Sequence, residues 1–259
     1  MIKFWGWIKE NYLAIVTPVV LLLIWEAASQ LGWIRANLLP GPSAIFMVLV
    51  ELVKTGELII NLGISIIRVA EGFIIGAALG VLVGVQVALV KKLRVAVSLI
   101  FGVLRPIPVI AWIPVLILWL GIDEGSKVTV IAIGSFWTVL VSVVQGIRNV
   151  DIKYLEVATI LEKDRLTLLT KVILPATLPA LFTGVRVGID VAWRSVVAAE
   201  LIAASSGIGY MIMYARELSQ IDTVLVGVLS IGLTGIVIDQ LLIILEKRLL
   251  KWNVNIHEA

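Results

Sequence analysis

The chain has 259 residues, of which 60% are hydrophobic and 15% charged, and its formal net charge is +3. Its mean hydropathy of +1.08 is far above that of soluble proteins. The charge-free runs 72–90, 106–122 and 128–147 reach or approach the length that crosses about 30 Å of hydrocarbon. The composition indicates an all-α membrane protein with several spans, because the short alternating segments of a transmembrane barrel are missing from the sequence.

The residue inventory excludes several kinds of site. There are no cysteines, which excludes disulfides, zinc thiolate sites and thiol catalysis. The single histidine, His257, lies in the C-terminal tail, so no metal site is expected. The positive net charge does not indicate nucleic-acid binding, since the placement of Lys and Arg matters more than their sum in a membrane protein. No GxxxxGK[ST] motif is present, so this chain is expected neither to bind nucleotide nor to be an enzyme.

The apolar pattern predicts one transmembrane domain over residues 1–259. Its first helix is interpreted as a retained span rather than a signal peptide, because no small-x-small cleavage site follows it. The second is longer than a perpendicular span and is expected to project beyond the bilayer. The six predicted spans are about 12–33, 59–90, 95–121, 127–147, 178–203 and 222–245, with a charged loop at 148–177.

The distribution of basic residues predicts the orientation. With the N-terminus in the cytoplasm, most lysines and arginines of the loops and tails fall on the inner side, whereas the outer side receives only Arg35, Lys54, Lys127 and Arg216. The positive-inside rule therefore favours a multi-pass protein of the plasma (cell inner) membrane, in contact with lipid and with both termini cytoplasmic.

The stretch LLPGPSAIFMVLVELVKTGE follows the first span and predicts an amphipathic helix on the outer surface. Pro40 and Pro42 end the first helix, and Ser43 is a candidate N-cap. Apolar residues then recur at helical spacing. Such a helix either serves an external partner or is a simple interfacial connector, and the sequence leaves both interpretations open.

A glycine occurs at every fourth position of the second span, at Gly72, Gly76, Gly80 and Gly84. Such a stripe lets another helix backbone approach closely, which is how helices associate where lipid removes the hydrophobic drive. We expect a tight helix contact within the bundle rather than a seam between two copies.

The loop 148–177 carries an unusual density of charge for this chain. Residues 153–163 have an apolar arc opposite a polar one, without the basic face of a membrane-surface anchor. Asp164 is placed to cap a second helix, 165–174, which Pro175 would end. A helix–turn–helix of this kind suits a groove on a partner protein, and packing against its own chain is the alternative. The predicted contact residues are Tyr154, Glu156, Val157, Ala158, Ile160, Leu161, Glu162, Lys163 and Pro175.

Polar residues also occur within the predicted spans, where they are functional candidates. Arg68 and Glu71 are three apart and favour a structural pair near the outer edge. Arg186, Asp190 and Arg194 recur every four residues, and the single aspartate can neutralise only one arginine. The second arginine predicts a positive surplus on the fifth span.

Prolines in the third span free backbone carbonyls, which is tolerated only against protein or a wet cavity. We therefore expect spans three and five to line a pathway in which arginine favours an anion such as a sulfonate or nitrate. The alternative is that the arginines pair with Glu200, Asp239 or Glu26 of other helices. Glu200 is expected to be a gate or packing group rather than a proton carrier. The candidate pathway residues are Arg105, Pro106, Pro108, Trp112, Pro114, Trp193, Arg194 and Glu200.

The charged loop carries a family resemblance. Its sequence EVATILE…VILPATLP resembles the EAA motif of ABC importer permeases, with EVA at 156–158 and ILP at 173–175. The stretches LLPGPS, RPIPVIAWIPVLILWLGI and AWRSVVAAELI…SGIGYMI are similar to the branch that moves sulfonates, taurine and nitrate. The resemblance covers essentially the whole chain, in the expected order.

The resemblance implies the type I ABC importer fold. It also implies a homodimer of permeases, an external solute-binding protein, and two ATPase subunits that bind ATP and Mg²⁺, with no cofactor in this chain. The loop would be the coupling helix that receives the motion of the ATPases. One residue departs from the motif, because Glu162 replaces a glycine. Since glutamate disfavours positive φ, we expect a different turn or a longer helix here.

Two other classes of protein compete with this interpretation. An ion- or proton-coupled secondary transporter would use Glu200 and Asp239 as relays, but it gives the helix–turn–helix no role. A membrane scaffold without transport would have no need of the prolines and arginines within the spans, which are costly in a bilayer.

Overall fold

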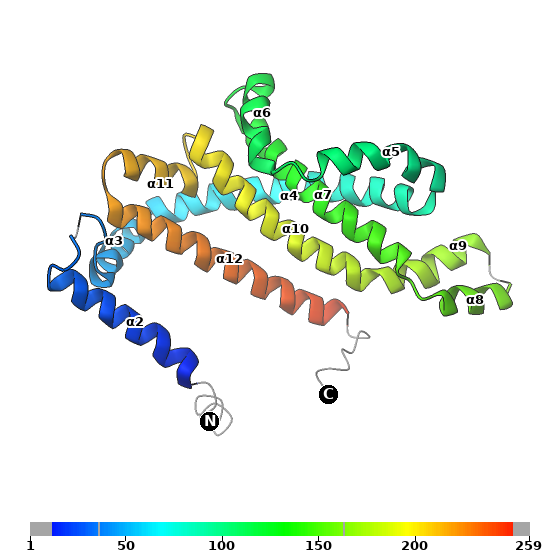
Figure 1. Ribbon diagram of the computed structural model, residues 1–259, viewed down its shortest axis with the longest axis horizontal. Coiled ribbons are helices and arrows are strands. Elements are labelled where there is room, and N and C mark those ends of the chain that lie inside the picture. Colours follow the sequence, from blue (N-terminus) through cyan, green and yellow to red (C-terminus); the bar gives the residue numbers. More distant parts are fainter. Residues whose placement is uncertain (1–11, 36, 163, 251–259) are drawn as a thin grey trace. The chain divides into compact units, whose positions relative to one another are not determined.

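A computed structural model describes residues 12–35, 37–162 and 164–250, and these are almost entirely helical (Figure 1). They form two compact units. The first contains the residues up to Ile60 together with Met211–Ser230, and the second contains Asn61–Tyr210 together with the residues from Ile231 on.

The first unit contains two N-terminal helices and parts of two later ones. They are α2 (Tyr12–Gln30), α3 (Pro42–Lys54), most of α11 (Ile208–Glu217) and the beginning of α12 (Ile221–Leu249). The amphipathic helix expected after the first span is α3. The prediction that Ser43 caps it is wrong, because Gly41 is the N-cap residue. The carboxylate of Glu26 in α2 instead accepts the Ser43 backbone N–H at 2.9 Å and its hydroxyl at 2.7 Å. A carboxylate at the N-terminus of α3 is attracted to the positive pole of the helix dipole.

The second unit is built around two long helices, α7 and α10, that pack side by side (Figure 1). Its core is the cluster Val69, Ile131, Ala192, Trp193 and Val196. The elements of this unit are α4 (Glu57–Leu89), α5 (Lys91–Leu104), η1 (Val109–Trp112), α6 (Ile113–Leu120), α7 (Glu124–Arg148), α8 (Ile152–Ile160), α9 (Arg165–Leu168), η2 (Leu169–Ile173), α10 (Leu174–Ala203) and the remainder of α12.

The glycine stripe of α4 lies against α7. A Cβ atom added at Gly72 would lie 2.6 Å from the Cβ of Ile131, and one at Gly80 would lie 2.9 Å from the Phe136 carbonyl oxygen. Gly76 and Gly84 meet the same helix equally closely. The two backbones approach to a distance that no larger residue permits, so the stripe is a contact inside one chain.

The third predicted span, 95–121, is not one helix. α5 ends at Leu104, η1 begins at Val109, and the two helical parts are bent by 86°. Pro106 and Pro108 cause the break, because each lacks a backbone N–H and each disfavours helical geometry in the residue before it. Pro114 lies in the first turn of α6, where a proline costs little.

Four helical segments within the described residues are long and apolar enough to cross a bilayer: Glu57–Leu89, Glu124–Arg148, Leu168–Glu217 and Ile221–Leu249. The bent pair would make a fifth crossing. α2 contributes a shorter apolar helix over Val16–Gln30. Each of these segments overlaps one of the six stretches that the sequence predicts, and the number of crossings remains a prediction.

Candidate functional site

The charged loop forms the helix–turn–helix that its sequence predicts, as α8 followed by α9 and the π-helical turn η2. The expectation that Pro175 ends the second helix is wrong, because η2 continues directly into α10. The Leu174 N–H donates to the Leu169 carbonyl across the wide turn, and Pro175 follows in the first turn of α10. A proline there needs no N–H, so the loop and the long helix remain continuous.

Aspartates begin both helices of the loop. Asp151 Oδ1 accepts the Lys153 backbone N–H at 2.9 Å, and Asp164 Oδ2 accepts the Thr167 backbone N–H at 3.2 Å. The predicted cap at Asp164 is thereby confirmed. Hydrogen bonds from the Thr167 side chain and backbone hold the pKa of the Asp164 carboxyl below its usual value, because they favour the ionised form.

Glu162 adopts a positive φ, the backbone conformation that we expected a glutamate to avoid. Its φ is +48°, in the left-handed region, and α8 already ends at Ile160. The expected longer helix or different turn is therefore wrong, and glutamate takes the conformation usual for the motif glycine. An L-residue pays about 1–2 kcal/mol for this conformation. Lys163 lies outside the described residues.

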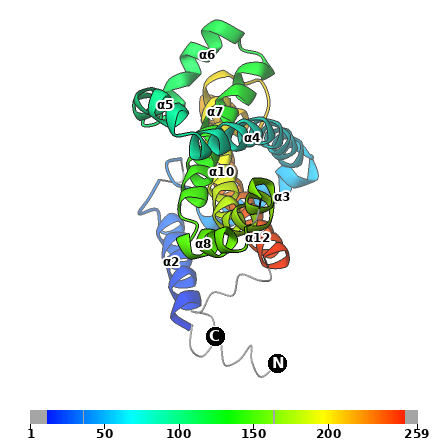
Figure 2. The ribbon, with the colours of Figure 1, turned by 90° about the vertical axis from the view of Figure 1, so that its right-hand side faces the viewer.

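α8 presents apolar side chains to the outside of the chain. The exposed fraction is 79% for Ile160, 59% for Leu161, 58% for Tyr154 and 55% for Val157. Ala158, which the sequence placed among the contact residues, is instead buried within the chain, and α8 packs against η2. Glu156 and Glu162 are exposed beside this surface. Figure 2 views the second unit from the end that carries α8. A contiguous exposed apolar surface of this kind typically marks a site of protein contact.

A buried polar cluster surrounds Arg68 of α4, and all five N–H donors of its guanidinium are used. They reach both carboxylate oxygens of Glu124, one oxygen of Glu200, and the carbonyl and hydroxyl oxygens of Ser206, over 2.6–2.9 Å. Arg68 and Glu200 are buried in the protein. The expected pair with Glu71 is wrong, since Glu71 lies on the exposed side of the helix.

Glu200 fastens the loop between α10 and α11 to this cluster. Its carboxylate also accepts the Ser65 hydroxyl at 2.8 Å and the Gly209 backbone N–H at 2.9 Å. Lys127 donates to Glu124 at 3.0 Å, so two cations face two carboxylates and the charges balance. Gly207 has a φ of +105°, and a Cβ there would collide with the Glu200 carboxylate.

Sequence reasoning missed most of this cluster. The members that it did not single out are Ser65, Glu124, Lys127, Ser206 and Gly209. They come from distant parts of the chain, and only Glu124 and Lys127, three residues apart on α7, are connected by a helical spacing. A second local signal is the pair of glycines in SGIG, shortly after Glu200.

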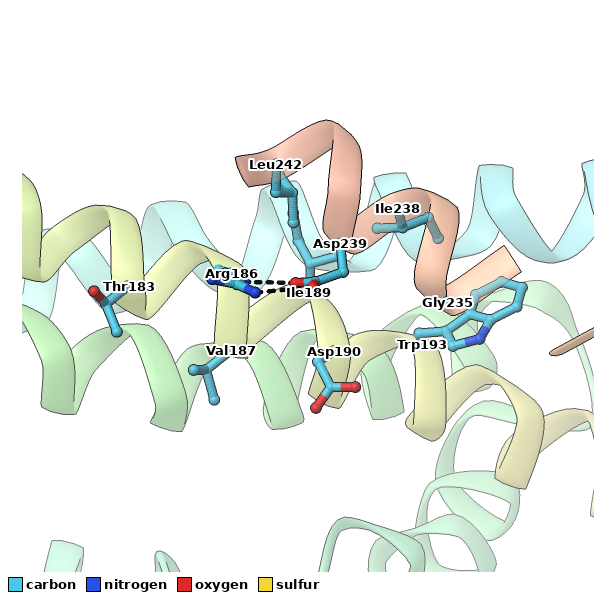
Figure 3. A pocket seen from close by; sticks show the side chains of 10 residues that line it. All are labelled: Thr183, Arg186, Val187, Ile189, Asp190, Trp193, Gly235, Ile238, Asp239 and Leu242. Atoms are coloured by element: carbon cyan, nitrogen blue, oxygen red, sulfur yellow. Dashed lines mark hydrogen bonds and ion pairs between the residues drawn. The ribbon is translucent and has the colours of Figure 1, made fainter. Parts of the chain in front are cut away.

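The two arginines of α10 are both neutralised by aspartates. Arg194 donates to Asp190 one turn earlier, and Arg186 binds Asp239 of α12 through two hydrogen bonds of 2.5 and 2.8 Å (Figure 3). The predicted positive surplus on this helix is wrong, because Asp239 supplies the missing carboxylate. The alternative that the sequence left open, pairing with acids of other helices, holds for Arg186.

The cavity in Figure 3, of about 380 Å³, lies between α10 and α12. Trp193 borders it but is otherwise buried, and its indole N–H donates to the Ile231 carbonyl at 3.2 Å. Trp112 lies elsewhere, against the cluster of Ile113 and Leu116, and its indole N–H has no partner within the described residues. The structure therefore separates these tryptophans, which the sequence assigned to one pathway.

Arg105 lies at the break between α5 and η1, where it lines two neighbouring cavities of about 680 and 400 Å³. Pro106, Trp137 and Val141 line both cavities, and Pro108 lines the smaller. Arg105 forms no ion pair with any carboxylate in the part of the chain that the structure describes. Of the predicted pathway residues, these cavities bring together Arg105, Pro106 and Pro108, and they exclude Pro114, Arg194 and Glu200.

Comparison with known proteins identifies the family. The sequence model of a protein family, described as the binding-protein-dependent transport system inner membrane component, matches residues 76–251, more than half of the chain. The chain belongs to this family. It is therefore a multi-pass membrane protein with the fold of a type I ABC importer permease, working with an ATPase and a solute-binding protein. ATP hydrolysis takes place in the separate ATPase subunit, so this chain is not an enzyme.

Curated relatives match over nearly their full length. The putative aliphatic sulfonates transport permease protein SsuC of Bacillus subtilis is 40% identical, over 97% of this chain and 90% of the relative. The taurine transport system permease protein TauC of Escherichia coli is 32% identical, over 96% and 93%. The bicarbonate transport system permease protein CmpB of Synechococcus elongatus is 31% identical, over 89% and 86%. The resemblance drawn from the motifs of the sequence is thereby confirmed.

Proposed function

We propose that this permease imports a small anion, an aliphatic sulfonate in the first place, with taurine and nitrate as the next candidates. The names of the sulfonate and taurine permeases among its relatives support this class of solute. Arg105 supports an anionic cargo independently, because it lines cavities within the membrane-spanning part and has no carboxylate partner among the described residues.

We assign the contact with the ATPase to the exposed apolar surface of α8. Tyr154, Val157, Ile160 and Leu161 would bury their exposed side chains in a groove of the ATPase, as helix-in-groove recognition requires. Buried Ala158 would hold α8 on the rest of the loop. The charged residues of the loop, Glu156, Glu162 and Lys163, would form the polar rim of the contact.

The junction at Pro175 would transmit the motion of the ATPase. Because η2 runs into α10 without a break, a displacement of the loop would tilt α10 as a rigid rod. α10 carries Trp193 and Arg194, so such a tilt would move predicted pathway residues. Glu200 at its other end would hold the outer loop closed rather than contact the solute.

The permease would act as a homodimer with both termini in the cytoplasm. The side chains of Asp190 and Arg194 are 50% and 75% exposed. This exposure supports contact with a second copy of the permease, since an exposed ion pair in a membrane-spanning helix is costly against lipid. A second α10 or the water of a shared pathway would relieve this cost. The excess of basic residues on the predicted inner loops supports the orientation.

ATP hydrolysis tests the proposal directly. The permease and its ATPase would be reconstituted in liposomes and assayed with a panel of solute-binding proteins, each empty or loaded with an alkanesulfonate, taurine or nitrate. We expect one sulfonate-loaded binding protein to stimulate hydrolysis above its empty form. Stimulation by no anion-loaded protein would refute the anion assignment, and failure of any ATPase to bind would refute the role of α8.

A further inference from the structure

Five of the arginines of the second unit fall into two groups. Arg68, Arg186 and Arg194 lie within membrane-spanning helices, and each forms an ion pair with a carboxylate. Arg105 and Arg148 line one cavity, and neither pairs with a carboxylate within the described residues. A guanidinium keeps its charge at any physiological pH, so this cavity holds a net positive charge.

The cavity has a volume of about 680 Å³ and is lined mainly by two helices. α5 contributes Ser98, Phe101 and Gly102, and α7 contributes Trp137, Leu140, Val141, Val144, Gln145 and Arg148. Arg105 and Pro106 directly follow α5, and Val87 belongs to α4. The rings of Phe101 and Trp137 meet edge to face with centroids 5.2 Å apart. The lining therefore combines an apolar aromatic wall with two cations and two uncharged hydrogen-bonding side chains.

The two arginines are separated along the cavity. Arg105 and Trp137 line both this cavity and its neighbour, which places them at the same end. Arg148 follows Trp137 by eleven residues on α7, or roughly 16 Å of helix at 1.5 Å per residue. Arg148 is in the last turn of α7, at the expected cytoplasmic end of that span. The cations thus form two separate positions rather than one clamp.

We propose that Arg105 and Arg148 form a two-step binding site for an organic oxyanion. Arg105 takes the anionic head first, with the aliphatic part against Phe101 and Trp137, and Arg148 takes the head next, on the side of release. The positive cavity attracts the anion, and two positions let it leave one arginine for the next, as conduction requires binding that is neither too weak nor too strong. This inference rests on the proposed import of an anion.

A second cavity provides an internal control. The cavity of about 380 Å³ between α10 and α12 also contains an arginine, Arg186, but two carboxylates line it as well: Asp239, which binds Arg186, and Asp190. It is lined by Thr183, which is comparable in size and polarity to Ser98 of the charged cavity. The two cavities differ in net charge, and that difference can be measured.

The absence of cysteine from the chain makes the measurement direct. Ser98→Cys and Thr183→Cys would each be introduced singly, and the permease–ATPase complex would be treated with an anionic methanethiosulfonate, the sulfonatoethyl reagent, or a cationic one, the trimethylammonioethyl reagent. The thiolate attacks the reagent sulfur, forms a mixed disulfide and releases methanesulfinate. The intact mass of the permease reports the rate.

We expect the ratio of anionic to cationic rates to be about tenfold higher for Ser98→Cys than for Thr183→Cys. Comparing ratios cancels the intrinsic difference between the reagents and any change in thiol pKa. Adding Arg105→Gln or Arg148→Gln to Ser98→Cys should lower the ratio severalfold each. Adding Arg216→Gln, an exposed arginine of α11 that lines neither cavity, should leave it unchanged.

Different results would overturn the two-step binding site and the proposed import of a sulfonate. Equal ratios at the two positions, or no reaction at Ser98→Cys, would overturn the charged cavity even if a sulfonate-loaded binding protein stimulates ATP hydrolysis. A high ratio that both arginine substitutions lower would support the site even if no sulfonate stimulates hydrolysis, and the sulfonate assignment alone would fall. A high ratio that neither substitution lowers would overturn the assignment to these arginines.

Discussion

The cluster around Arg68 and the loop that carries α8 treat their charged and apolar groups in opposite ways. In the cluster, charged residues from three helices meet inside the chain, and every donor of the guanidinium has an acceptor. In the loop, the carboxylates of Asp151 and Asp164 accept hydrogen bonds from neighbouring backbone N–H groups, while large apolar side chains remain exposed. The cluster is complete within one chain, whereas the loop leaves its apolar surface open to a partner.

The difference follows from what each kind of group costs when left unsatisfied. A buried charge without a partner costs several kcal/mol, so the cluster has to close within the chain before any partner arrives. Exposed apolar side chains cost much less, and another protein can cover them later. Stability should therefore depend on the cluster, and assembly on the loop.

The largest effect is expected from breaking the cluster. Glu200→Ala removes the carboxylate that faces buried Arg68 and the Gly209 N–H, and we expect a loss of about 3–5 kcal/mol of stability, as for other broken buried pairs. Thermal unfolding in detergent measures it. Glu71→Gln, on the exposed side of α4, the helix that carries Arg68, is the control and should change stability by less than about 0.5 kcal/mol. Equal melting temperatures would mean that the cluster does not hold this end of the protein together.

A substitution on the loop should have the opposite profile. Ile160→Asp places a charge at the most exposed of the four apolar side chains on the surface of α8, and we expect ATPase binding to weaken at least about 30-fold, or about 2 kcal/mol, with no loss of thermal stability. Affinity in detergent measures it by titration. Leu218→Asp, another exposed apolar position, lies outside the loop and should bind the ATPase normally. Normal binding by Ile160→Asp would place the contact elsewhere.

Sequence reasoning succeeded where a pattern is local. Hydropathy predicted the helical segments, the spacing in 153–163 predicted α8, and Asp164 predicted a helix start. The prolines were recognised as a disturbance of the third span, but not as a bend of 86°. Each of these features depends on residues within one or two turns of each other.

It failed where partners are far apart or the backbone is strained. The neutralisation of Arg186 needs Asp239, 53 residues later, and that of Arg68 needs Glu124 and Glu200, and no local spacing connects either arginine with these carboxylates. Arg105 stands out only once Arg68, Arg186 and Arg194 are seen to pair with carboxylates, whereas Arg105 has no such pair within the described residues. At Glu162, intrinsic preference pointed away from positive φ, and the connection between α8 and α9 overrode it.

That strained turn gives a smaller effect in the stabilising direction. Glu162→Gly removes the cost of a left-handed glutamate, and we expect a gain of up to about 1 kcal/mol in the stability of the loop. Limited proteolysis of the loop and affinity for the ATPase measure it. Ser219→Gly is the matched control, because Ser219 also has a positive φ but lies far from the loop in sequence. It should leave proteolysis of the loop and ATPase affinity unchanged, and a looser loop in Glu162→Gly would show that glutamate makes a contact there.

The smallest effect concerns the cap at Asp164. Its pKa is lowered in the folded loop, so its contribution is fully present above the unfolded value of about 3.9 and is lost as pH falls through the lower folded value. Hydrogen exchange of the α9–η2 segment, corrected for intrinsic rates, should therefore show constant protection from neutral pH to about pH 5 and weaker protection only below about pH 4. Asp164→Asn keeps an acceptor without a titrating group, so its protection should stay flat across the same range. If the wild-type loop also stayed flat, the carboxylate would contribute nothing beyond the hydrogen bond that asparagine supplies.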